Sequence, residues 1–265
     1  MRQRLVSAII AIILFVPFVI KGGGYFAFCM AVLGIVAIYE FIKMSGLSFM
    51  DYGIGLIASF GMLALLIPNY LLPAPLATIH LDYFFYLSTV FLLLLMVIKN
   101  QKIAFADITG IIFAMIYIGY GFGFLVQIRE LGILTILYQF LVVWSTDIGA
   151  YVFGRQFGKR KLAPHISPNK TIEGSLGGIA LSTVIGIIYV NLFNPNFVML
   201  TNVWILTIVM SIMGQLGDLV ESMIKRHFKV KDSGNFMPGH GGVLDRFDSM
   251  IFTSFIFMMW LNIFS

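Results

Sequence analysis

Nine runs of apolar residues, separated by short polar segments, constrain most strongly how this chain can fold. Each run is close to the ~20 residues that an α-helix needs to cross a bilayer. The runs fall near residues 4–21, 24–43, 52–69, 79–98, 103–124, 133–153, 175–193, 200–224 and 248–264. Hydrophobic residues make up 60% of the chain and charged residues only 11%, which excludes a soluble globular protein. We therefore predict an all-α integral membrane protein, a polytopic bundle of about nine transmembrane helices.

The first apolar run follows Arg2 and Arg4, as the apolar part of a signal peptide would. The run is longer than the ~7–15 residues of that part, and no small-residue cleavage site follows it. We interpret it as a membrane helix. The single cysteine, Cys29, has no partner for an intrachain disulfide, and we interpret it as a packing residue.

Basic residues divide unequally between the two sides of the predicted bundle. Nine helices place Lys21 and Arg129 on one side and the other 15 of the 17 basic residues on the opposite side. The positive-inside rule then predicts a cytoplasmic N-terminus and an external C-terminus in a multi-pass protein of the cell membrane. The net charge of +5 reflects this topology and an attraction to anionic lipid. It does not indicate nucleic-acid binding, because no basic soluble domain is present.

Ionisable residues are concentrated after residue 144, whereas the first half of the chain contains few. We expect residues 1–130 to be a transmembrane scaffold and residues 131–265 to be a transmembrane catalytic region. Two polar segments, 154–174 and 225–247, are expected to form its cytoplasmic loops.

The stretch from Gly217 to Ser249 has the densest group of charged side chains. Its ionisable residues include Asp218, Glu221, Lys225, Arg226, Lys229, Lys231, Asp232, His240, Asp245, Arg246 and Asp248. In the eighth run, polar residues recur at the spacing of one helical face. These residues are Ser211, Gln215, Asp218, Glu221, Ser222 and Lys225. Carboxylates bind hard cations and basic side chains bind phosphate, so the stretch is a candidate site for a metal and a polyphosphate.

Asp218 and Asp245 are the candidate metal ligands. Asp218 ends one predicted helix and Asp245 begins the next, so both lie at the same membrane face and can meet across the 225–244 loop. Two carboxylates beside Lys and Arg favour Mg²⁺ and a polyphosphate.

Two structural alternatives apply to these acidic residues. Glu221 is spaced to form an ion pair with Lys225, whereas the nearest basic residue in sequence to Asp218 lies seven positions away. Helix capping is the alternative for Asp245 and Asp248, and it explains Asp248 better.

The loop Pro238–Gly242, with the sequence PGHGG, contains three glycines around His240. Such a backbone can direct its N–H groups toward phosphate oxygens. His240 is a candidate hydrogen-bond donor to phosphate. The alternative is that it is an ordinary polar loop residue. Lys225 and Arg226 lie nearer the predicted metal site than Lys229, which we interpret as topogenic.

A second group of polar residues runs from Ser145 to Gly178. Asp147 shares a helical face with Tyr151 and Gly154. In the segment SPNKTIEG (167–174), Lys170 offers a positive charge and Thr171 a hydroxyl group that are suited to bind phosphate. Thr171 is also suited to cap the seventh helix. His165 is interpreted as a loop residue. Four basic residues are expected mainly to set topology or contact lipid headgroups: Arg155, Lys159, Arg160 and Lys161.

Residues 144–249 resemble the phosphatidate cytidylyltransferases, also called CDP-diacylglycerol synthases. The matching positions are Ser222, Lys225, Arg226, Lys231, Asp232, Gly234, Pro238, Gly239, His240, Gly241, Gly242, Asp245, Arg246 and Asp248. The segments DIGAYVFGR and SPNKTIEG are similar to those of the family as well. The resemblance implies a polytopic helical fold, often dimeric, with Mg²⁺ held by Asp218 and Asp245 at a site facing the cytoplasm. It also implies a monovalent cation such as K⁺ as a possible second occupant.

The resemblance implies transfer of CMP from CTP to phosphatidic acid, with CDP-diacylglycerol and pyrophosphate as products. The catalytic candidates are Lys225, Arg226, His240 and Arg246. The candidates for substrate or phosphate binding are Asp147, Ser167, Asn169, Lys170, Thr171, Glu221, Ser222, Lys231, Asp232, Gly241, Gly242 and Asp248. Another CTP-dependent lipid enzyme, such as a polyprenol kinase, is the alternative within enzymes. A secondary transporter would favour charges at the bilayer midplane and inverted repeats, neither of which is visible.

Overall fold

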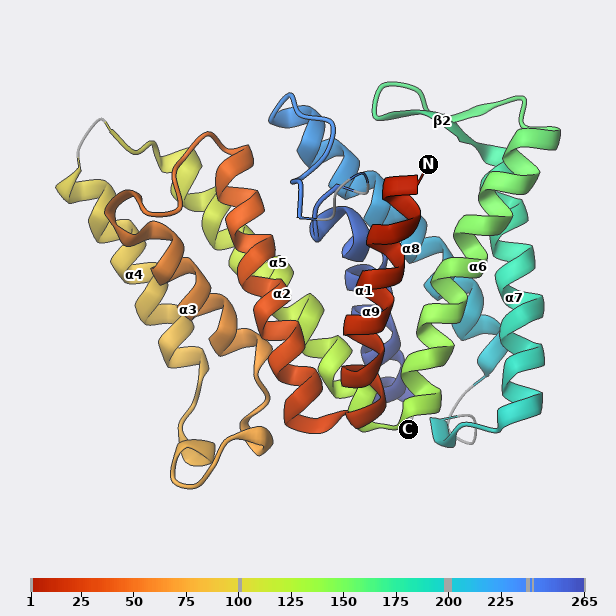
Figure 1. Cartoon of the computed structure of the whole chain (residues 1–265), viewed down its shortest axis with the longest axis horizontal. Helices are drawn as coiled ribbons and strands as arrows, with labels where there is room; N and C mark the ends of the chain where they lie inside the picture. The colour runs from red at the N-terminus through yellow and green to blue at the C-terminus, as the bar shows by residue number, and fades with distance from the viewer. Residues whose placement is uncertain (1, 100–101, 198–201, 237–238, 240, 265) are drawn as a thin grey trace. The chain divides into compact units, whose positions relative to one another are not determined.

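Nine α-helices account for most of the computed structural model, which describes residues 2–99, 102–197, 202–236, 239 and 241–264 (Figure 1). The helices are α1 (Arg2–Lys21), α2 (Gly23–Met44), α3 (Ile54–Leu66), α4 (Asp82–Ile98), α5 (Phe105–Glu130), α6 (Ile133–Phe157), α7 (Ile172–Phe193), α8 (Val203–His227) and α9 (Leu244–Phe264). The remaining elements are strands β1 (Lys161–Ala163) and β2 (Ser167–Thr171) and the 3-10 helices η1 (Asp51–Gly53), η2 (Asn69–Leu71) and η3 (Leu76–Thr78).

Each predicted apolar run corresponds to one helix, which confirms the all-α polytopic prediction. Six helices in the described part of the chain are long and apolar enough to cross a membrane, namely α2 and α5 to α9. The apolar segments Ile9–Lys21 of α1, Asp51–Leu66 and α4 are shorter. The orientation of the chain in the membrane stays a prediction.

Several helices extend beyond the apolar runs that predicted them. We expected α5 to end near 124, α6 to end near 153 and α9 to begin near 248, but these helices reach Glu130, Phe157 and Leu244. Backbone hydrogen bonding continues into polar residues at the end of a membrane helix, where water is accessible. Apolar composition therefore marks the part suited to the bilayer and not the end of the helix.

The chain forms two compact units. Unit 1 consists of Met1–Gln127 together with Val230–Asp245, and unit 2 consists of Ile128–Lys229 together with Arg246–Ser265. Unit 1 thus includes α1 to α4, most of α5 and the segment that precedes α9, whereas unit 2 includes α6, α7, α8 and most of α9. The functional division into a scaffold before residue 130 and a catalytic region after it stays a prediction.

Small residues bring the helices of unit 1 close together. A Cβ at Gly34 of α2 would lie 2.9 Å from the side chain of Met62 in α3. A Cβ at Gly119 of α5 would lie 2.9 Å from the backbone oxygen of the same Met62, and Gly123 lies similarly close to the carbonyl of Leu65. Close backbone approach through glycine is a common way for membrane helices to pack, because lipid supplies no hydrophobic driving force between them.

Unit 2 combines glycine packing with buried polar contacts. Gly174 and Gly178 lie one helical turn apart on α7, and a Cβ at either would lie 2.6 Å from a backbone oxygen of α6. The hydroxyl groups of Tyr138 (α6) and Thr207 (α8) are 2.5 Å apart. Gln139 donates from Nε2 to the carbonyl oxygen of Met250 in α9 at 3.2 Å. These contacts hold α6, α7, α8 and α9 in one helical bundle.

A β-hairpin occupies much of the segment that we expected to be the first polar loop. Its strands pair antiparallel, with Lys161 opposite Thr171 and Ala163 opposite Ser167. Figure 1 shows β1 and β2 projecting beyond the ends of α6 and α7. The strands contain only three and five residues and are not apolar, so hydrophobic periodicity does not predict them.

Candidate functional site

Three carboxylates of unit 2 come from three different helices. Asp218 of α8 exerts its negative charge on both Asp147 of α6 and Asp248 of α9, and Asp147 also acts on Asp248. Carboxylates that repel one another persist together when cations neutralise them. This group, called the acidic cluster below, is therefore the part of unit 2 best suited to attract cations.

Lys170 supplies one of the positive charges beside the acidic cluster. Its Nζ forms an ion pair with Oδ2 of Asp218, and Ser222 donates a hydrogen bond to Asp218 Oδ1 at 3.3 Å. The sequence suggested no ion-pair partner for Asp218, because the nearest basic residue was seven positions away. That expectation was wrong: Lys170 is far from Asp218 in sequence, but the hairpin brings it to α8.

Two further basic residues act on the same carboxylates. Lys225 attracts Asp248, and Arg246 attracts Asp147. Lys225 also forms an ion pair with Glu221, whose side chain is only 3% exposed. The ion pair between Glu221 and Lys225, which the sequence spacing offered as the structural alternative, is thus confirmed.

The polar face of α8 divides into two parts. Near the middle of the helix, Ser211 and Thr146 of α6 share a hydrogen bond of 2.8 Å. Gln215 donates to the carbonyl oxygen of Ser175 in α7 at 3.4 Å. These residues join helices, whereas Asp218, Glu221 and Lys225 form the charged part of the same face.

Asp245, in unit 1, is held mainly by backbone. Its Oδ2 accepts hydrogen bonds from Gly242 N at 2.8 Å, from Ser233 N at 2.9 Å and from Ser233 Oγ at 2.9 Å. A carboxylate with three donors on one oxygen has a well-defined orientation.

The assignment of a capping role to Asp248 was wrong. Helix α9 begins at Leu244, so Asp245 lies in its first turn and accepts the hydrogen bond from Gly242 N. Asp248 lies one turn further on, where its Oδ1 accepts from Ser249 N at 2.6 Å.

The two candidate metal ligands belong to different units. Asp218 lies in unit 2 and Asp245 in unit 1, so their predicted convergence on one metal stays a prediction. Two residues of the PGHGG loop, Pro238 and His240, lie outside the described residues. Gly241 and Gly242 are described, and both approach Asp245 or its partner Ser233.

The other predicted site residues lie at the polar ends of helices or in the hairpin. Thr171 is the N-cap of α7 and accepts a hydrogen bond from Gly174 N at 3.1 Å, which confirms its alternative role. Ser167 is half-buried in β2, and Asn169 beside it is exposed. Three further residues are exposed at or after the end of α8: Arg226, Lys231 and Asp232.

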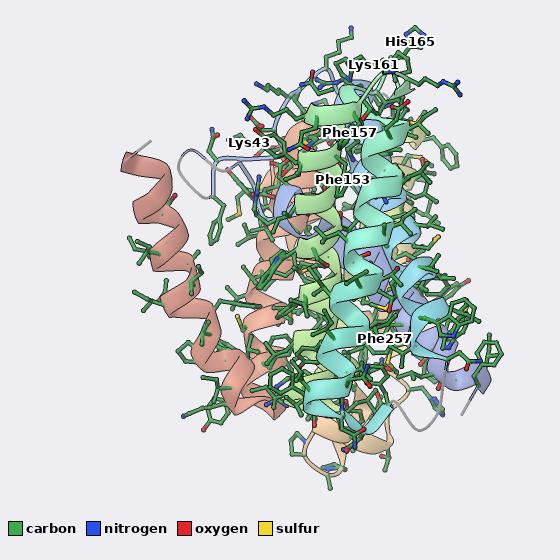
Figure 2. All side chains as sticks on the ribbon, turned by 90° about the vertical axis from the view of Figure 1, so that its right-hand side faces the viewer. Lys43, Phe153, Phe157, Lys161, His165 and Phe257 are labelled. Atoms are coloured by element: carbon green, nitrogen blue, oxygen red, sulfur yellow. The ribbon has the colours of Figure 1, made fainter. Side chains whose placement is uncertain are left out.

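His165 lies in the turn that joins β1 to β2, and Lys161 lies at the base of the hairpin, opposite Thr171; both are exposed (Figure 2). Neither is among the side chains that act on the acidic cluster. The position of His165 agrees with its interpretation as a loop residue, whereas the topogenic role of Lys161 stays a prediction.

Two carboxylates that the sequence analysis did not select hold loops near these residues. Glu173 Oε2 accepts from Lys159 N at 3.0 Å and from Arg160 N at 3.1 Å, which fixes the turn between α6 and β1. Glu40 of α2 accepts from the backbone of Val243 and Leu244. A signal for Glu40 was present in the sequence, because an acidic residue within an apolar membrane helix is costly unless it has partners.

The donor atoms of the acidic cluster suit a divalent cation. Among the described residues, no group of three His, Cys, Asp or Glu side chains lies close enough to hold a metal ion as it stands. Asp147, Asp218 and Asp248 nevertheless supply hard oxygen donors that repel one another, and a cation would relieve this repulsion. The residues therefore fit Mg²⁺ in chemical type.

Comparison with known proteins agrees with the resemblance seen in the sequence. The pattern of the cytidylyltransferase family matches residues 2–264. The phosphatidate cytidylyltransferase of Staphylococcus aureus (strain COL) is 42% identical over 255 residues, which cover 95% of each chain. Those of Staphylococcus epidermidis (strain ATCC 12228) and Staphylococcus saprophyticus are 43% and 41% identical, again over 95% of each chain. Together with the helical fold and the acidic cluster, these matches show that the chain belongs to the cytidylyltransferase family of membrane-bound nucleotidyltransferases.

Proposed function

We propose that this protein transfers CMP from CTP to phosphatidic acid, giving CDP-diacylglycerol and pyrophosphate. The observation that carries the proposal is the identity of 42% over 95% of the chain to a phosphatidate cytidylyltransferase. The charges of unit 2 support it, because carboxylates and basic side chains from separate helices are gathered there as a nucleotide polyphosphate and its metal require.

The reaction exchanges one phosphoanhydride bond for another. An oxygen of the phosphatidic acid phosphate forms a bond to the α-phosphorus of CTP, and the bond from this phosphorus to the oxygen that bridges to the β-phosphorus breaks. The electron pair of the broken bond leaves with pyrophosphate. A phosphate monoester has a second pKa near ~6, so it is largely dianionic at neutral pH and no strong general base is needed.

The main barriers are repulsion between two anions and charge on the leaving group. Lys225 and Arg246 lie beside the acidic cluster and are suited to neutralise phosphate oxygens, together with Arg226. Asp147, Asp218 and Asp248 of the acidic cluster would hold Mg²⁺ in unit 2, and Asp245 of unit 1 stays a predicted metal ligand. When bound, Mg²⁺ would neutralise the polyphosphate and orient it for in-line displacement.

The ion pair between Lys170 and Asp218 has a clear consequence under this proposal. Lys170 and a metal cation compete for the same carboxylate, and Asp218 and a phosphate compete for the same ammonium group. Binding of CTP with its metal therefore exchanges one set of ion pairs for another. The exchange keeps both side chains neutralised before and after substrate binds.

We place the site at the cytoplasmic face of the cell membrane, with the acyl chains of phosphatidic acid in the bilayer and CTP arriving from the cytoplasm. The distribution of basic residues supports this orientation. A homodimer and a second cation such as K⁺ rest on the family resemblance alone.

The proposal is tested with CTP labelled on either its α- or its γ-phosphate. The purified protein in lipid nanodiscs receives phosphatidic acid, diacylglycerol or a polyprenol as the acceptor. CMP transfer puts the α-label, and not the γ-label, into lipid, and only with phosphatidic acid. Transfer of the γ-label to a polyprenol would instead establish the kinase alternative. Vesicles without any acceptor lipid are the control.

A further inference from the structure

Glu40 is a buried carboxylate in an apolar helix that the sequence analysis treated as scaffold. It lies on α2 and is only 2% exposed. A buried carboxylate is tolerated only when hydrogen bonds or opposite charges compensate its loss of water. Its partners therefore indicate why this residue is present.

The partners of Glu40 lie at the other end of the chain. Oε1 accepts from Val243 N at 2.9 Å, and Oε2 accepts from Leu244 N at 3.1 Å. These residues are 203 and 204 positions away in sequence. Since α9 begins at Leu244, Glu40 satisfies backbone donors at the N-terminus of α9 that have no partner within the helix.

The backbone around Glu40 is shaped to fit it. A Cβ at Gly234 would lie 2.8 Å from both Cγ and Cδ of Glu40. A Cβ at Gly242 would collide with both Glu40 oxygens and with Ser233 Oγ. Gly234 and Gly242 thus pack against Glu40 at positions where only glycine fits without displacement.

Ser233 connects Glu40 to the candidate metal ligand Asp245. Its Oγ lies 3.3 Å from Glu40 Oε2 and 2.9 Å from Asp245 Oδ2. Two consecutive backbone N–H groups also connect the two carboxylates. Gly242 N donates to Asp245, and Val243 N donates to Glu40. Movement of Glu40 would therefore shift the groups that orient Asp245.

We propose that Glu40 is a positioning residue for the reaction, which orients Asp245 through Ser233 and the backbone of residues 242–244 without touching substrate. This inference rests on the proposed function for its kinetic consequence. All of the contacts that carry it lie within unit 1. It also assigns a role in the reaction to the N-terminal part of the chain.

Glu40→Gln is the sharpest variant, because it keeps the size of the side chain. Glu40 uses both oxygens as acceptors, so an amide nitrogen in either position would face a backbone N–H and one hydrogen bond would be lost. Partners that orient a metal ligand are typically worth about 10- to 100-fold in metal affinity or activity. We expect the Mg²⁺ concentration for half-maximal activity to rise by about tenfold or more, and kcat to fall.

Hydrogen–deuterium exchange supplies a readout that does not depend on activity. In Glu40→Gln, amides of residues 241–245 should exchange faster, whereas peptides from α6 and α7 should be unchanged. Mn²⁺ binding, measured by the EPR signal of free Mn²⁺, should weaken in the same variant. Glu40→Asp, which keeps a carboxylate on a shorter side chain, should recover part of the Mg²⁺ dependence.

Asp107→Asn is the matched control. Asp107 also accepts a backbone hydrogen bond at the start of a helix of unit 1, from Ala104 N at 2.9 Å, only three positions away in sequence. The variant should leave the Mg²⁺ dependence within about twofold of that of the original protein, because asparagine keeps an oxygen that can accept this bond.

The possible outcomes separate the inference from the proposed function. Unchanged exchange at 241–245 and unchanged Mg²⁺ dependence in Glu40→Gln would overturn the positioning role. A lower Tm with unaltered kcat and Mg²⁺ dependence would also overturn it, because Glu40 would then only stabilise the fold. If the original protein makes no CDP-diacylglycerol, the proposed function is wrong. Faster exchange at 241–245 in Glu40→Gln would still show in that case that Glu40 holds this part of the backbone.

A second variant keeps the test decisive if Glu40→Gln does not fold. Ser233→Ala removes the hydroxyl group between Glu40 and Asp245 and retains the backbone N–H of residue 233. It should raise the Mg²⁺ requirement in the same direction by a smaller factor. An unchanged Mg²⁺ requirement in this variant would contradict the proposed link.

Discussion

In unit 1 the carboxylates of Glu40 and Asp245 accept hydrogen bonds from backbone N–H groups and Ser233, whereas in unit 2 the carboxylate of Asp218 is paired with the ammonium group of Lys170. Backbone donors belong to the fold and cannot leave. A lysine side chain has four rotatable bonds and can move to another anion.

This difference suggests different tasks for the two sets of acidic residues. Carboxylates held by backbone have one orientation, which suits a fixed ligand and the loop around it. Carboxylates held by lysine can exchange partners, which suits the part of a site where a polyphosphate and its metal enter and leave. Substitutions at these and neighbouring residues test this contrast.

Asp218→Asn and Asp245→Asn should each reduce turnover by roughly a thousandfold, because a metal ion supplies several kcal/mol of transition-state stabilisation. The CTP assay at limiting Mg²⁺ measures the loss. The three hydrogen bonds to Asp245 all go to Oδ2, so the amide oxygen of asparagine can accept them. Exchange of residues 241–245 should therefore stay unchanged in both variants and accelerate only in Asp245→Ala, which removes the acceptor. Near-normal activity of either variant at limiting Mg²⁺ would show that its residue is not a metal ligand.

Lys225→Gln should reduce kcat by about a hundredfold, since removal of one donor to a developing charge typically has this effect. The variant also leaves the buried carboxylate of Glu221 without its ion-pair partner, which should lower the stability of the fold by roughly 3 kcal/mol. The double variant Glu221→Gln with Lys225→Gln should restore Tm without restoring activity. Lys161→Gln is the matched control for loss of one positive charge, and an equal loss of activity there would mean that only overall charge matters.

Lys170→Ala should reduce kcat/KM for CTP by about 10- to 100-fold, because a hydrogen bond to a charged group is typically worth ~1.5–3 kcal/mol. The KM for phosphatidic acid should change less. Steady-state kinetics with each substrate varied in turn measure the split. Loss of affinity for the lipid alone would assign Lys170 to phosphatidic acid, and unaltered kinetics would leave it as a topogenic charge that pairs with Asp218.

Glu173→Gln should change kcat/KM by less than about threefold. The backbone hydrogen bonds from Lys159 and Arg160 go to a single oxygen, Oε2, so the amide oxygen of glutamine can accept them. Glu40 uses both oxygens, and the same substitution there is expected to be far more damaging. Comparison of the two variants by thermal unfolding and CTP kinetics shows whether the number of accepting oxygens decides the effect; a larger loss at Glu173 would contradict it.

Much of the fold could be predicted because a bilayer permits few solutions. An apolar run of spanning length must satisfy its own backbone hydrogen bonds, so each run predicted one helix and each is observed. Helix ends were less accurate, because polar residues such as Arg155 and Asp245 remain helical outside the apolar part. The β1–β2 hairpin was missed because its short polar strands have no hydrophobic alternation.

The candidate site could be predicted only as a set of residue types at helix ends. Local relations were visible in the spacing, as for the ion pair of Glu221 with Lys225 and the capping of α7 by Thr171. Relations between distant segments were not visible, and so Lys170 was not recognised as the partner of Asp218.

Apolar length and motif spacing are local properties of the chain, so they were enough to predict a polytopic helical membrane protein, its family and the segments that contain its chemistry. The contacts between distant side chains came from the fold: Lys170 with Asp218, and Glu40 with the start of α9. The physical reason is that a buried charge must find its partner wherever the fold brings a donor near, and a separation of 204 residues leaves no trace in sequence spacing.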